Sequence, residues 1–390
     1  MNTAYILKIL RTPGGKAPRG NFHAVRPDDL AAIVIRALVD QTGVDPHKID
    51  DVILGCAFPE AEQGMNVARV AALRAGLPVD VPAFTVNRFC SSGLQAIAMA
   101  ADRIRLGEAD CIIAGGTESM SMVPMGGNKY SANPKLVAMW PETFAAMGIT
   151  AELLVDQYGI SRESQDAFAC RSHQNADTAI SCGDFVEEVV PVEVEQADLV
   201  GTEMRKQVMT IDTDEGVRAG TTPETLAKLK PAFRQGGSVT AGNSSQMTDG
   251  AAACMVVSEA FLKNVKSDPQ ARFVSYAVSG VAPEIMGIGP VEAIPVALQK
   301  AGLKLGDINQ IELNEAFAAQ ALAVIKAAKL NPEIINVNGG AIALGHPLGC
   351  TGAKLTATLL HSLQRSDQRY GMVTMCVGGG MGASGIFERV

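Results

Sequence analysis

Cys90 stands where two elements of different kind meet, in the stretch from Val86 to Gly93. A strand-like run ends just before this cysteine, and a helix of small residues begins just after it. The positive end of a helix dipole lowers the pKa of a thiol at such a position and favours the thiolate, which is the nucleophilic form. The position therefore predicts a covalent nucleophile, with a buried structural cysteine as the alternative.

His346 lies in a second stretch suited to chemistry, which holds several glycines and has a proline directly after the histidine. Such a rigid and exposed backbone suits a general base, or a donor to a developing oxyanion. The remaining histidines stand in polar or helical surroundings and are predicted to be surface or boundary residues: His23, His47, His173 and His361.

Cys376 ends an apolar strand-like run and precedes a glycine cluster that begins at Gly378. Active-site residues gather at strand ends in open α/β sheets, and glycines let backbone N–H groups approach a ligand as an oxyanion hole requires. A phosphate loop is the weaker interpretation, because no Walker-type GK[ST] motif is present. Asn314 follows another short strand, where it could hold a water or donate to a carbonyl, or cap the next helix.

A zinc site is the rival use of cysteine and histidine. His346 and Cys350 are four residues apart, but no second pair with ligand spacing accompanies them, so no metal site is predicted. The eight cysteines form no CxxC pair, which favours free thiols in a reducing cytoplasm over a disulfide framework.

Composition excludes several classes of protein. The chain has 390 residues, a net charge of −8 and no run of Lys or Arg, so nucleic-acid binding is not expected. The N-terminus lacks the features of a signal peptide. The sequence contains no run of about 18 apolar residues, so a transmembrane helix is not expected.

Alternating strand-like and helix-like stretches predict an α/β fold. Strands are expected at Tyr5–Leu10, Asp51–Leu54, Pro82–Val86 and Cys111–Ala114, and helices at Pro27–Gln41, Ser91 to about Leu106, and Ser161–Ser181. The stretch Gly43 to Phe58 is repeated by Gly302 to Phe317, which indicates two related halves; chance similarity is the alternative. Between the halves, a region richer in charge from Ser119 to Met247, irregular from Gln196 to Gly220, is expected to form a lid or binding loop domain.

Six motifs together resemble the thiolase family. They are NRFCSSGLQA around Cys90, GGTESMS from Gly115, TAGNSSQMTDGAA from Thr240, NEAFAAQ from Asn314, NGGAIALGHPLGCTGA from Asn338 and CVGGGMGA from Cys376. The resemblance implies a five-layered αβαβα fold. It would divide into an N-terminal half at 1–118 plus about 248–267, an inserted loop domain at 119–247, and a C-terminal half at 268–390.

The resemblance also implies residue roles. Cys90 would be the acylated nucleophile, His346 would take its proton, and Cys376 would be the second acid/base. One oxyanion hole would comprise His346 and a water held by Asn314; the other would comprise the backbone N–H groups of Cys90 and Gly378. Coenzyme A would be a co-substrate, with no permanently bound cofactor, and its expected contacts are Arg218 at the nucleotide end, Ser245 at the pantetheine and Met147 in the loop domain.

The implied activity is cleavage of a 3-ketoacyl-CoA in fatty-acid β-oxidation. Biosynthetic acetoacetyl-CoA thiolases often carry a histidine before the Met-Gly of the loop domain, where this chain has Ala146. A homodimer or tetramer is expected, with a possible hydratase/dehydrogenase partner subunit. One alternative is the biosynthetic enzyme, and another is an inactive acyl-CoA or lipid-binding protein on the same scaffold. A third is a ketoacyl synthase, which the second cysteine, Cys376, disfavours.

Overall fold

The first half of the chain builds a five-stranded part of the central sheet. The computed structural model describes residues 2–200 and 203–390. Within them, five strands lie in the order β1-β8-β5-β3-β4. Their bounds are β1 Ala4–Arg11, β3 Asp51–Gly55, β4 Ala83–Val86, β5 Cys111–Ser119 and β8 Thr248–Ser258. The strand that follows the long middle region, β8, therefore returns to the centre of the first half.

The second half repeats this arrangement. Its strands lie in the order β9-β12-β11-β10, with bounds β9 Ala271–Gly280, β10 Gln310–Leu313, β11 Tyr370–Val377 and β12 Met381–Arg389. In both halves a parallel pair, β3/β5 or β10/β11, is followed by two antiparallel pairings. The two glycines of the sequence repeat, Gly43 and Gly302, both end a helix with a left-handed φ, of 64° and 69°. The predicted duplication is thus present in the strand order.

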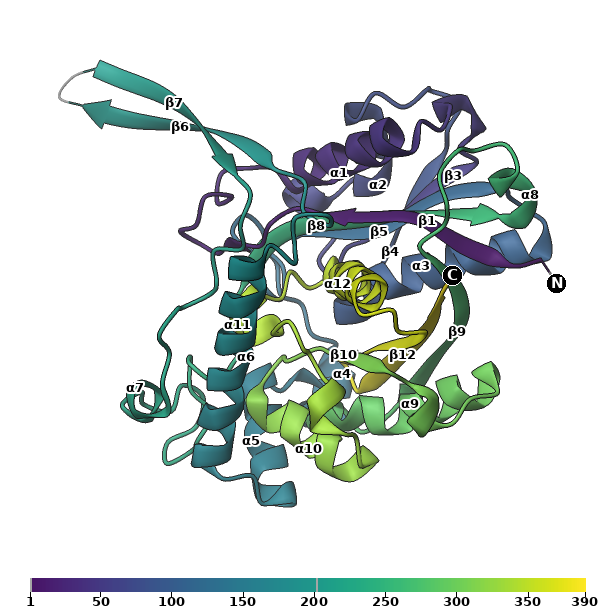
Figure 1. Ribbon diagram of the computed structural model, residues 1–390. Helices are drawn as coiled ribbons and strands as arrows, with labels where there is room; N and C mark the ends of the chain where they lie inside the picture. The colour runs from purple at the N-terminus through teal and green to yellow at the C-terminus, as the bar shows by residue number, and fades with distance from the viewer. Residues whose placement is uncertain (1, 201–202) are drawn as a thin grey trace.

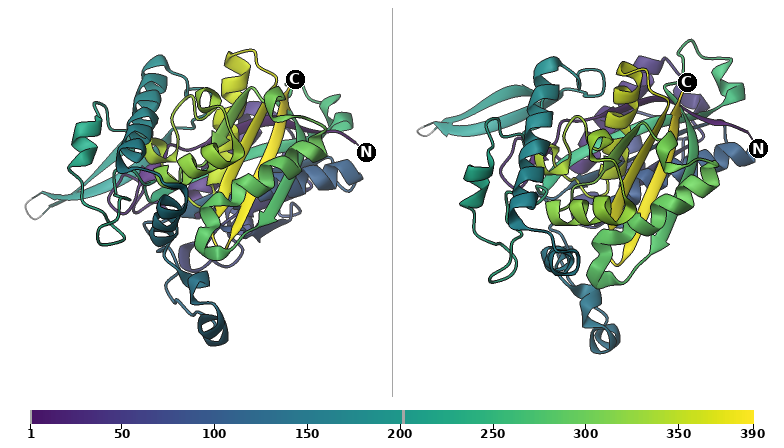
Figure 2. Two further views of the ribbon diagram at one scale, coloured as in Figure 1. Left: turned by 90° about the horizontal axis from the view of Figure 1, so that it is seen from below. Right: turned by 60° about the horizontal axis from the view of Figure 1, so that its bottom comes forward.

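Helices cover both halves and fill the space between them, which gives the predicted five layers (Figure 1). One outer layer holds α1 and α2, the central layer holds α3 and α12, and the other outer layer holds α9 and α10. The bounds of these helices are α1 Pro27–Thr42, α2 Val67–Arg74, α3 Ser92–Leu106, α9 Gly289–Ala301, α10 Ala318–Ala328 and α12 Thr351–Arg365. A short pairing of Tyr5 with Arg272 and of Ile6 with Ala271 joins the halves into one hydrogen-bonded sheet. Further views are given in Figure 2.

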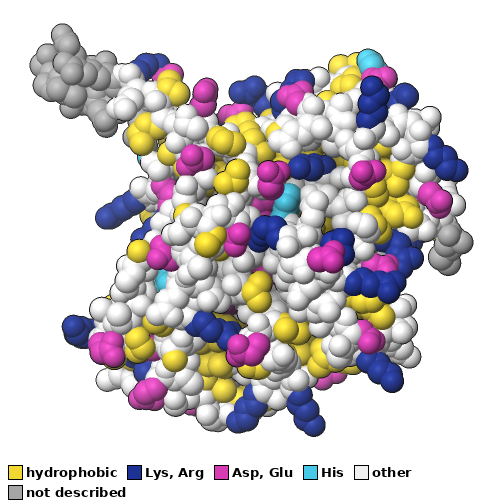
Figure 3. All heavy atoms as spheres, viewed as in Figure 1, with side chains coloured by type: hydrophobic (Ala, Val, Ile, Leu, Met, Phe, Trp, Pro, Cys, Tyr) yellow, Lys and Arg dark blue, Asp and Glu magenta, His cyan; other side chains and the backbone are white. Residues whose placement is uncertain are grey.

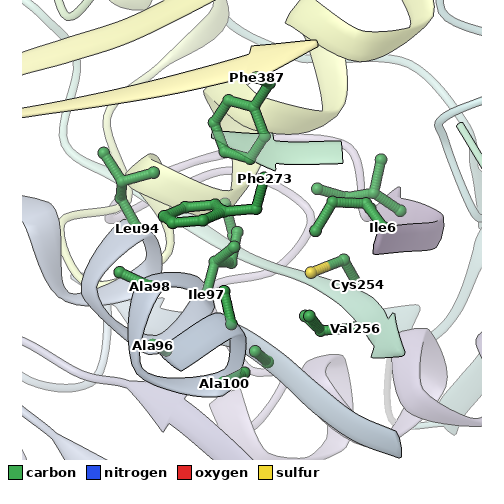
Figure 4. Close-up of a cluster of buried hydrophobic side chains, with 14 of the residues drawn as sticks. Ile6, Leu94, Ala96, Ile97, Ala98, Ala100, Cys254, Val256, Phe273 and Phe387 are labelled. Carbon is green, nitrogen blue, oxygen red and sulfur yellow. The ribbon is translucent and has the colours of Figure 1, made fainter. Parts of the chain in front are cut away.

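The central layer is packed with small aliphatic residues. In Figure 4, Leu94 and Ile97 of α3 lie near Phe273 of β9 and Phe387 of β12. The two phenylalanine rings meet edge to face, with centroids 5.5 Å apart. Alanines on the same helix keep it close to the sheets: Ala96, Ala98 and Ala100. Close packing of this layer fixes the two helices whose N-terminal ends build the site described below.

The middle region contains helices α4 Pro134–Met139, α5 Met147–Tyr158, α6 Arg162–Cys182 and α7 Pro223–Ala227, and strands β6 Val192–Val200 and β7 Glu203–Ile211. The prediction of an irregular stretch from Gln196 to Gly220 was wrong for most of its length, because β6 and β7 pair as an antiparallel hairpin that projects from the body (Figure 1). Val192 and Val194 are buried while Glu193 and Glu195 are exposed, and this period-two pattern is typical of a strand. Residues 201–202 of that stretch lie outside the described residues.

Short elements complete the fold: β2 Gly15–Lys16, α8 Glu259–Leu262 and α11 Ala341–Leu344, and 3-10 turns at Pro46–Lys48, Ala61–Gln63, Phe89–Ser91, Pro141–Phe144, Pro283–Ile288, Leu305–Asp307 and Pro332–Ile334. No helix in the described part of the chain is long and apolar enough to cross a membrane. On the face shown in Figure 3, Lys and Arg side chains alternate with Asp and Glu and form no basic stripe.

Candidate active site

The N-terminal ends of α3 and α12 meet at two glycines. A Cβ atom on Gly93 of α3 would lie 2.8 Å from the backbone nitrogen of Ala353, and one on Gly352 of α12 would overlap the backbone of Leu94. Only glycines permit such a close approach of the two backbones. The crossing places the stretch before α3, which holds Cys90, beside the stretch before α12, which holds His346.

Cys90 lies in the 3-10 turn between β4 and α3. The preceding residue, Phe89, has a left-handed φ of 42°, an uncommon conformation for a bulky residue that often marks a functional turn. Cys90 is partly exposed and packs against a small apolar cluster that includes Met120 and Leu348. The backbone N–H groups of Gly378 and of Cys90 itself are hydrogen-bonded to the sulfur.

The protonation state of Cys90 differs from the sequence prediction. Desolvation raises the pKa of Cys90 to about 11, and the hydrogen bonds from Gly378 and Cys90 lower it by less than burial raises it. The prediction of a lowered pKa was therefore wrong, because it considered the helix end alone and not the apolar surroundings supplied by distant residues. The group is a thiol near pH 7 and needs a base to become a nucleophile.

His346 is buried, and each of its ring nitrogens has one neighbour. Nδ1 lies 2.6 Å from Oγ1 of Thr351, which itself donates its proton to the carbonyl oxygen of Pro347 at 3.0 Å. The hydroxyl has no second proton, so it accepts the hydrogen bond from Nδ1–H. Nε2 is left as the basic nitrogen and faces Nδ2 of Asn314 at 3.4 Å. Burial, and then Lys354, lower the pKa of His346 to about 3, so the ring is neutral near pH 7.

Asn314 is fully buried directly after β10. Its Oδ1 has no hydrogen-bond partner within the described ranges, while its backbone N–H donates to the carbonyl of Thr374 at 2.9 Å. The next helix, α10, begins only at Ala318, with Phe317 at the capping position, so the alternative role of Asn314 as a helix cap was wrong. A buried amide that neither caps a helix nor has all its bonds satisfied is typical of a functional position.

Cys376 lies at the end of β11 and is buried in an apolar cluster with Met286, Phe317 and the partly buried Met147. Burial, and then the nearby Cys90, raise the pKa of the Cys376 thiol. The two cysteines, which are far apart in the sequence, thus lie within electrostatic reach of each other.

A cavity of about 260 Å³ lies between α6, α7 and the loops around residues 218–221 and 241–246. Arg218 lines this cavity, and its role as a ligand contact stays a prediction. Ser245 does not line it, but its neighbour Gln246 does, and the Ser245 N–H donates to the carbonyl of Ala316 at 3.0 Å. Met147 lies in the Cys376 cluster and not in this cavity.

Comparison with known proteins decides the family. Residues 4–260 match the family described as "Thiolase, N-terminal domain", and residues 267–389 match "Thiolase, C-terminal domain". The chain belongs to the thiolase family. A 3-ketoacyl-CoA thiolase of Bacillus subtilis (strain 168) is 54% identical over 391 residues, covering 100% of both chains. An acetyl-CoA acetyltransferase of Pseudomonas aeruginosa is 47% identical, covering 98% of both.

A solved structure shares the fold. The crystal structure of the Bacillus anthracis acetyl-CoA acetyltransferase superposes with a TM-score of 0.91 at 42% identity, covering 100% of this chain and 99% of that one. The predicted thiolase fold is therefore confirmed, and the chain is an acyltransferase of this family.

Two further residues of this thiolase position the site, and the sequence analysis did not single them out. One is Thr351, which fixes the His346 proton. The other is Glu118, buried at the end of β5, whose carboxylate accepts hydrogen bonds from the backbone of Ala57 at 2.7 Å, the backbone of Gly349 at 2.7 Å and the side chain of Gln63 at 2.6 Å. An acidic residue inside a strand of otherwise uncharged residues was the available signal for Glu118. No feature of the sequence pointed to Thr351.

Two histidines are not where the sequence predicted. His173 and His361 are only 5% and 3% exposed, so their interpretation as surface or boundary residues was wrong; each packs on the inner face of a long helix. Among the described residues, no group of three or more His, Cys, Asp or Glu side chains is placed to hold a metal ion.

Proposed function

We propose that this thiolase cleaves 3-ketoacyl-CoA with coenzyme A to acetyl-CoA and a shortened acyl-CoA in fatty-acid β-oxidation. The observation that carries the proposal is the approach of two thiols, Cys90 and Cys376. A neutral base of fixed tautomer, His346, stands in the stretch before α12, whose first turn touches that of α3. A protein that only binds acyl-CoA needs neither two thiols nor a histidine of fixed tautomer, so the inactive-binder alternative is disfavoured.

In the first half-reaction, the sulfur of Cys90 attacks the 3-keto carbonyl while its proton passes to Nε2 of His346. The separate pKa values, about 11 for Cys90 and about 3 for His346, disfavour an ion pair formed in advance. Proton transfer therefore accompanies attack, when negative charge moves to the carbonyl oxygen and is stabilised by the N–H groups of Cys90 and Gly378.

The bond between the second and third acyl carbons then breaks. The electron pair moves into the acetyl-CoA enolate, whose oxygen is stabilised by His346 and a water held by Asn314. Cys376 gives its proton to the enolate carbon, which releases acetyl-CoA and leaves acyl-Cys90, a Cys376 thiolate and protonated His346.

In the second half-reaction, a new coenzyme A thiol gives its proton to the Cys376 thiolate and attacks acyl-Cys90. The departing Cys90 sulfur takes the proton back from His346, and every group returns to its starting state. Two half-reactions through a covalent intermediate predict ping-pong kinetics. Coenzyme A is thus a co-substrate, and the chemistry requires no permanently bound cofactor.

Coenzyme A is proposed to occupy the cavity that Arg218 lines, with Ser245 along the pantetheine. The cavity lies beside residues 244–247, and isolated bridges join Ser244 to Phe317 and Met247 to His346. A pantetheine arm running along this segment leads from the cavity towards the catalytic residues.

The degradative role is supported by the residues around Cys376. Met147, Met286 and Phe317 give this side of the site an apolar wall, which suits a long acyl chain, and Ala146 offers no imidazole there. The relatives also include an acetyl-CoA acetyltransferase, so biosynthetic acetoacetyl-CoA thiolase is the second candidate.

We propose that the chain forms a homodimer or tetramer, because apolar side chains are exposed near one edge of the sheet. The edge strand β4 packs beside α2, and Met65 and Val79 nearby are 94% and 81% exposed. Exposed apolar side chains at an open sheet edge favour association. We also propose a complex with a hydratase/dehydrogenase subunit and a location in the reducing cytoplasm. The proposed domains are an N-terminal half at 1–118 plus about 248–267, a loop domain at 119–247 and a C-terminal half at 268–390.

The test is thiolysis of acetoacetyl-CoA and of 3-ketohexadecanoyl-CoA by the wild type, by Cys90→Ala and by the matched control Cys182→Ala, an exposed cysteine. Loss of the 3-ketoacyl-CoA absorbance is followed. Activity on the long substrate that vanishes only in Cys90→Ala is expected. Preference for acetoacetyl-CoA would favour the biosynthetic candidate, and a wild type inert on both substrates would contradict the proposal.

A further inference from the structure

A closed ring of side chains surrounds the turn that carries Cys90. Oγ of Ser91, the residue directly after Cys90, lies 3.0 Å from the hydroxyl of Tyr276 in β9. That hydroxyl donates to Oε1 of Gln95 at 3.3 Å, and the same oxygen accepts from Nε of Arg88 at 2.7 Å. Arg88 stands two residues before Cys90, so the ring is closed by the backbone of the turn itself.

The direction of each hydrogen bond in the ring is determined by its partners. Arg88 can only donate, so the atom of Gln95 that faces it is the amide oxygen, which carries no proton. Tyr276 therefore donates its only proton to Gln95 and accepts the proton of Ser91. Burial raises the pKa of Tyr276 to about 12, so the phenol keeps its proton near pH 7. The ring thus uses the Tyr276 hydroxyl both as donor and as acceptor.

The ring holds a backbone conformation that is unfavourable by itself. Phe89 has a left-handed φ of 42°, and a bulky residue keeps such a conformation only where its surroundings impose it. Inside the turn, the Arg88 N–H donates to Oγ of Ser92 at 2.8 Å, and this hydroxyl donates to the Phe89 carbonyl at 2.7 Å. The backbone N–H of Cys90 belongs to the same turn. Tyr276 comes from the second half of the chain, so residues of both halves determine the direction of this N–H.

We propose that Tyr276 is a positioning residue, whose hydroxyl holds the turn so that the N–H of Cys90 is directed at the oxyanion formed when the sulfur attacks a carbonyl. This inference rests on the proposed function, which uses this N–H in an oxyanion hole. Charge develops on the oxygen only in the transition state, so a misdirected donor slows acylation without weakening substrate binding. Alkylation of the same sulfur by iodoacetamide forms no oxyanion and does not need the donor.

Two variants and their combination test the ring. Tyr276→Phe removes the hydroxyl and keeps the aromatic ring, and Ser91→Ala removes the hydrogen-bonding partner. Tyr5→Phe is the matched control, at a partly buried tyrosine of β1 that packs on a different core cluster. Single-turnover acylation of Cys90 is measured by mass spectrometry of its peptide, with 3-ketohexadecanoyl-CoA and with acetyl-CoA, which transfers its acetyl group to the sulfur and leaves as the coenzyme A thiol. The rate of alkylation of Cys90 by iodoacetamide is measured in the same proteins.

We expect acylation to slow about 10-fold in Tyr276→Phe, less than the ~10²–10³ that loss of an oxyanion donor costs, because the N–H is misdirected and not removed. The alkylation rate and the substrate concentration at half-maximal acylation should stay within about 2-fold of wild type. Ser91→Ala should also slow acylation, and the double variant should be no slower than Tyr276→Phe, because both changes remove the same hydrogen bond. Tyr5→Phe should match the wild type.

Equal slowing of acylation and alkylation, or effects that add fully in the double variant, would overturn the inference and leave Tyr276 a packing residue. The two proposals fail separately. A wild type that acetyl-CoA acylates but the 3-ketoacyl-CoA does not contradicts only the proposed function. A wild type that both substrates acylate, with Tyr276→Phe equally fast, contradicts only this inference, and a wild type that neither substrate acylates contradicts both.

Discussion

At the scale of single residues, the hydrogen bonds around His346 determine which ring nitrogen can act as a base. The Thr351 hydroxyl donates its proton to the Pro347 carbonyl, so it can only accept the hydrogen bond from Nδ1–H of His346. This leaves the Nε2 lone pair directed towards Asn314 and the reaction space. A valine of nearly the same shape would remove the acceptor, and the imidazole would be free to adopt the unproductive tautomer.

Thr351→Val should therefore lower kcat for thiolysis by about 10- to 100-fold, a part of the ~10²–10⁴ that a positioned general base contributes. Thr351→Ser keeps the hydroxyl and should restore most of the rate. Single-turnover acylation of Cys90 is the measurement, because it isolates the step in which His346 takes a proton. A valine variant as fast as the serine variant would show that the hydroxyl does not orient the base.

Glu118 allows a second prediction at this scale. Its carboxylate accepts from the backbone of Ala57 and Gly349 and from Gln63, and an amide cannot accept all these bonds, because one oxygen becomes an NH₂ donor. Glu118→Gln should cost about 1–3 kcal/mol of unfolding free energy, the effect of unsatisfied buried donors, and should lower kcat/KM.

The matched control for this prediction is Glu312→Gln. Burial raises the pKa of both acids, but hydrogen bonds from Ala57, Gly349 and Gln63 oppose the rise at Glu118. The pKa of Glu312 is raised well above its usual value, and its Oε2 has no partner among the described residues, so its protonated acid resembles an amide already. Urea unfolding and thiolysis assays of both variants provide the comparison. Equal losses of unfolding free energy and of activity in the two variants would mean that Glu118 has no special role in positioning the site.

At the scale of elements, the crossing of α3 and α12 brings the two halves of the site together. Their first turns touch through Gly93 and Gly352, where a Cβ atom would meet the opposite backbone. Side chains pack on both sides of the crossing in the central core, so the helices cannot shift independently. The two glycines thus determine how closely the helices that follow Cys90 and His346 approach each other.

Gly352→Ala should force α3 and α12 apart and cost about 1–3 kcal/mol, the usual effect of overpacking. Because the shift acts on the catalytic spacing, the acylation rate should fall as well. Gly306→Ala is the control, since a Cβ there would meet open space. Urea unfolding with single-turnover acylation tests this, and an alanine variant with wild-type values in both would contradict the proposed role of the crossing.

At the scale of the whole molecule, a buried network ties the two halves to the middle region. Arg11 of β1 pairs with Glu188 at 2.6 Å and with Asp214 at 2.9 Å, and Asp214 also meets Lys354 of α12 at 3.4 Å. Breaking such a buried network is costly because it leaves a charge unpaired. The middle region therefore contributes buried charges, Glu188 and Asp214, that pair with residues of both halves.

Buried histidines make the stability of this structure depend on pH. The pKa of His173 is about 4 in the folded protein and about 6.5 in an unfolded chain, so the unfolded chain binds more protons between these values. Stability that is present at pH 7 is therefore lost as the pH falls from 6.5 towards 4.

The loss of unfolding free energy between pH 7 and pH 5 should accordingly be smaller in His173→Gln than in wild type, by about 2 kcal/mol. Urea unfolding at the two pH values gives this double difference, in which the contributions of other groups cancel. A variant with the same or a larger loss would mean that His173 does not titrate below its unfolded value.

The sequence by itself determined the order of the elements and the residues able to do chemistry. Alternating patterns predicted β1, β3 and β4, the repeat from Gly302 predicted the second half, and the strand-to-helix junction singled out Cys90. These signals are local, because hydrophobic period, glycine position and residue type can be read within one stretch of chain.

The tertiary structure alone decided how those residues behave. The hydrogen bond from Gly349 to Glu118 spans 231 positions, and no local pattern records such a partner. Burial by distant residues made Cys90 a thiol where its helix end predicted a thiolate, and turned His173 from a predicted surface residue into a cavity wall. Protonation depends on burial and on neighbours in space, and both are fixed only when the two halves and the middle region have packed together.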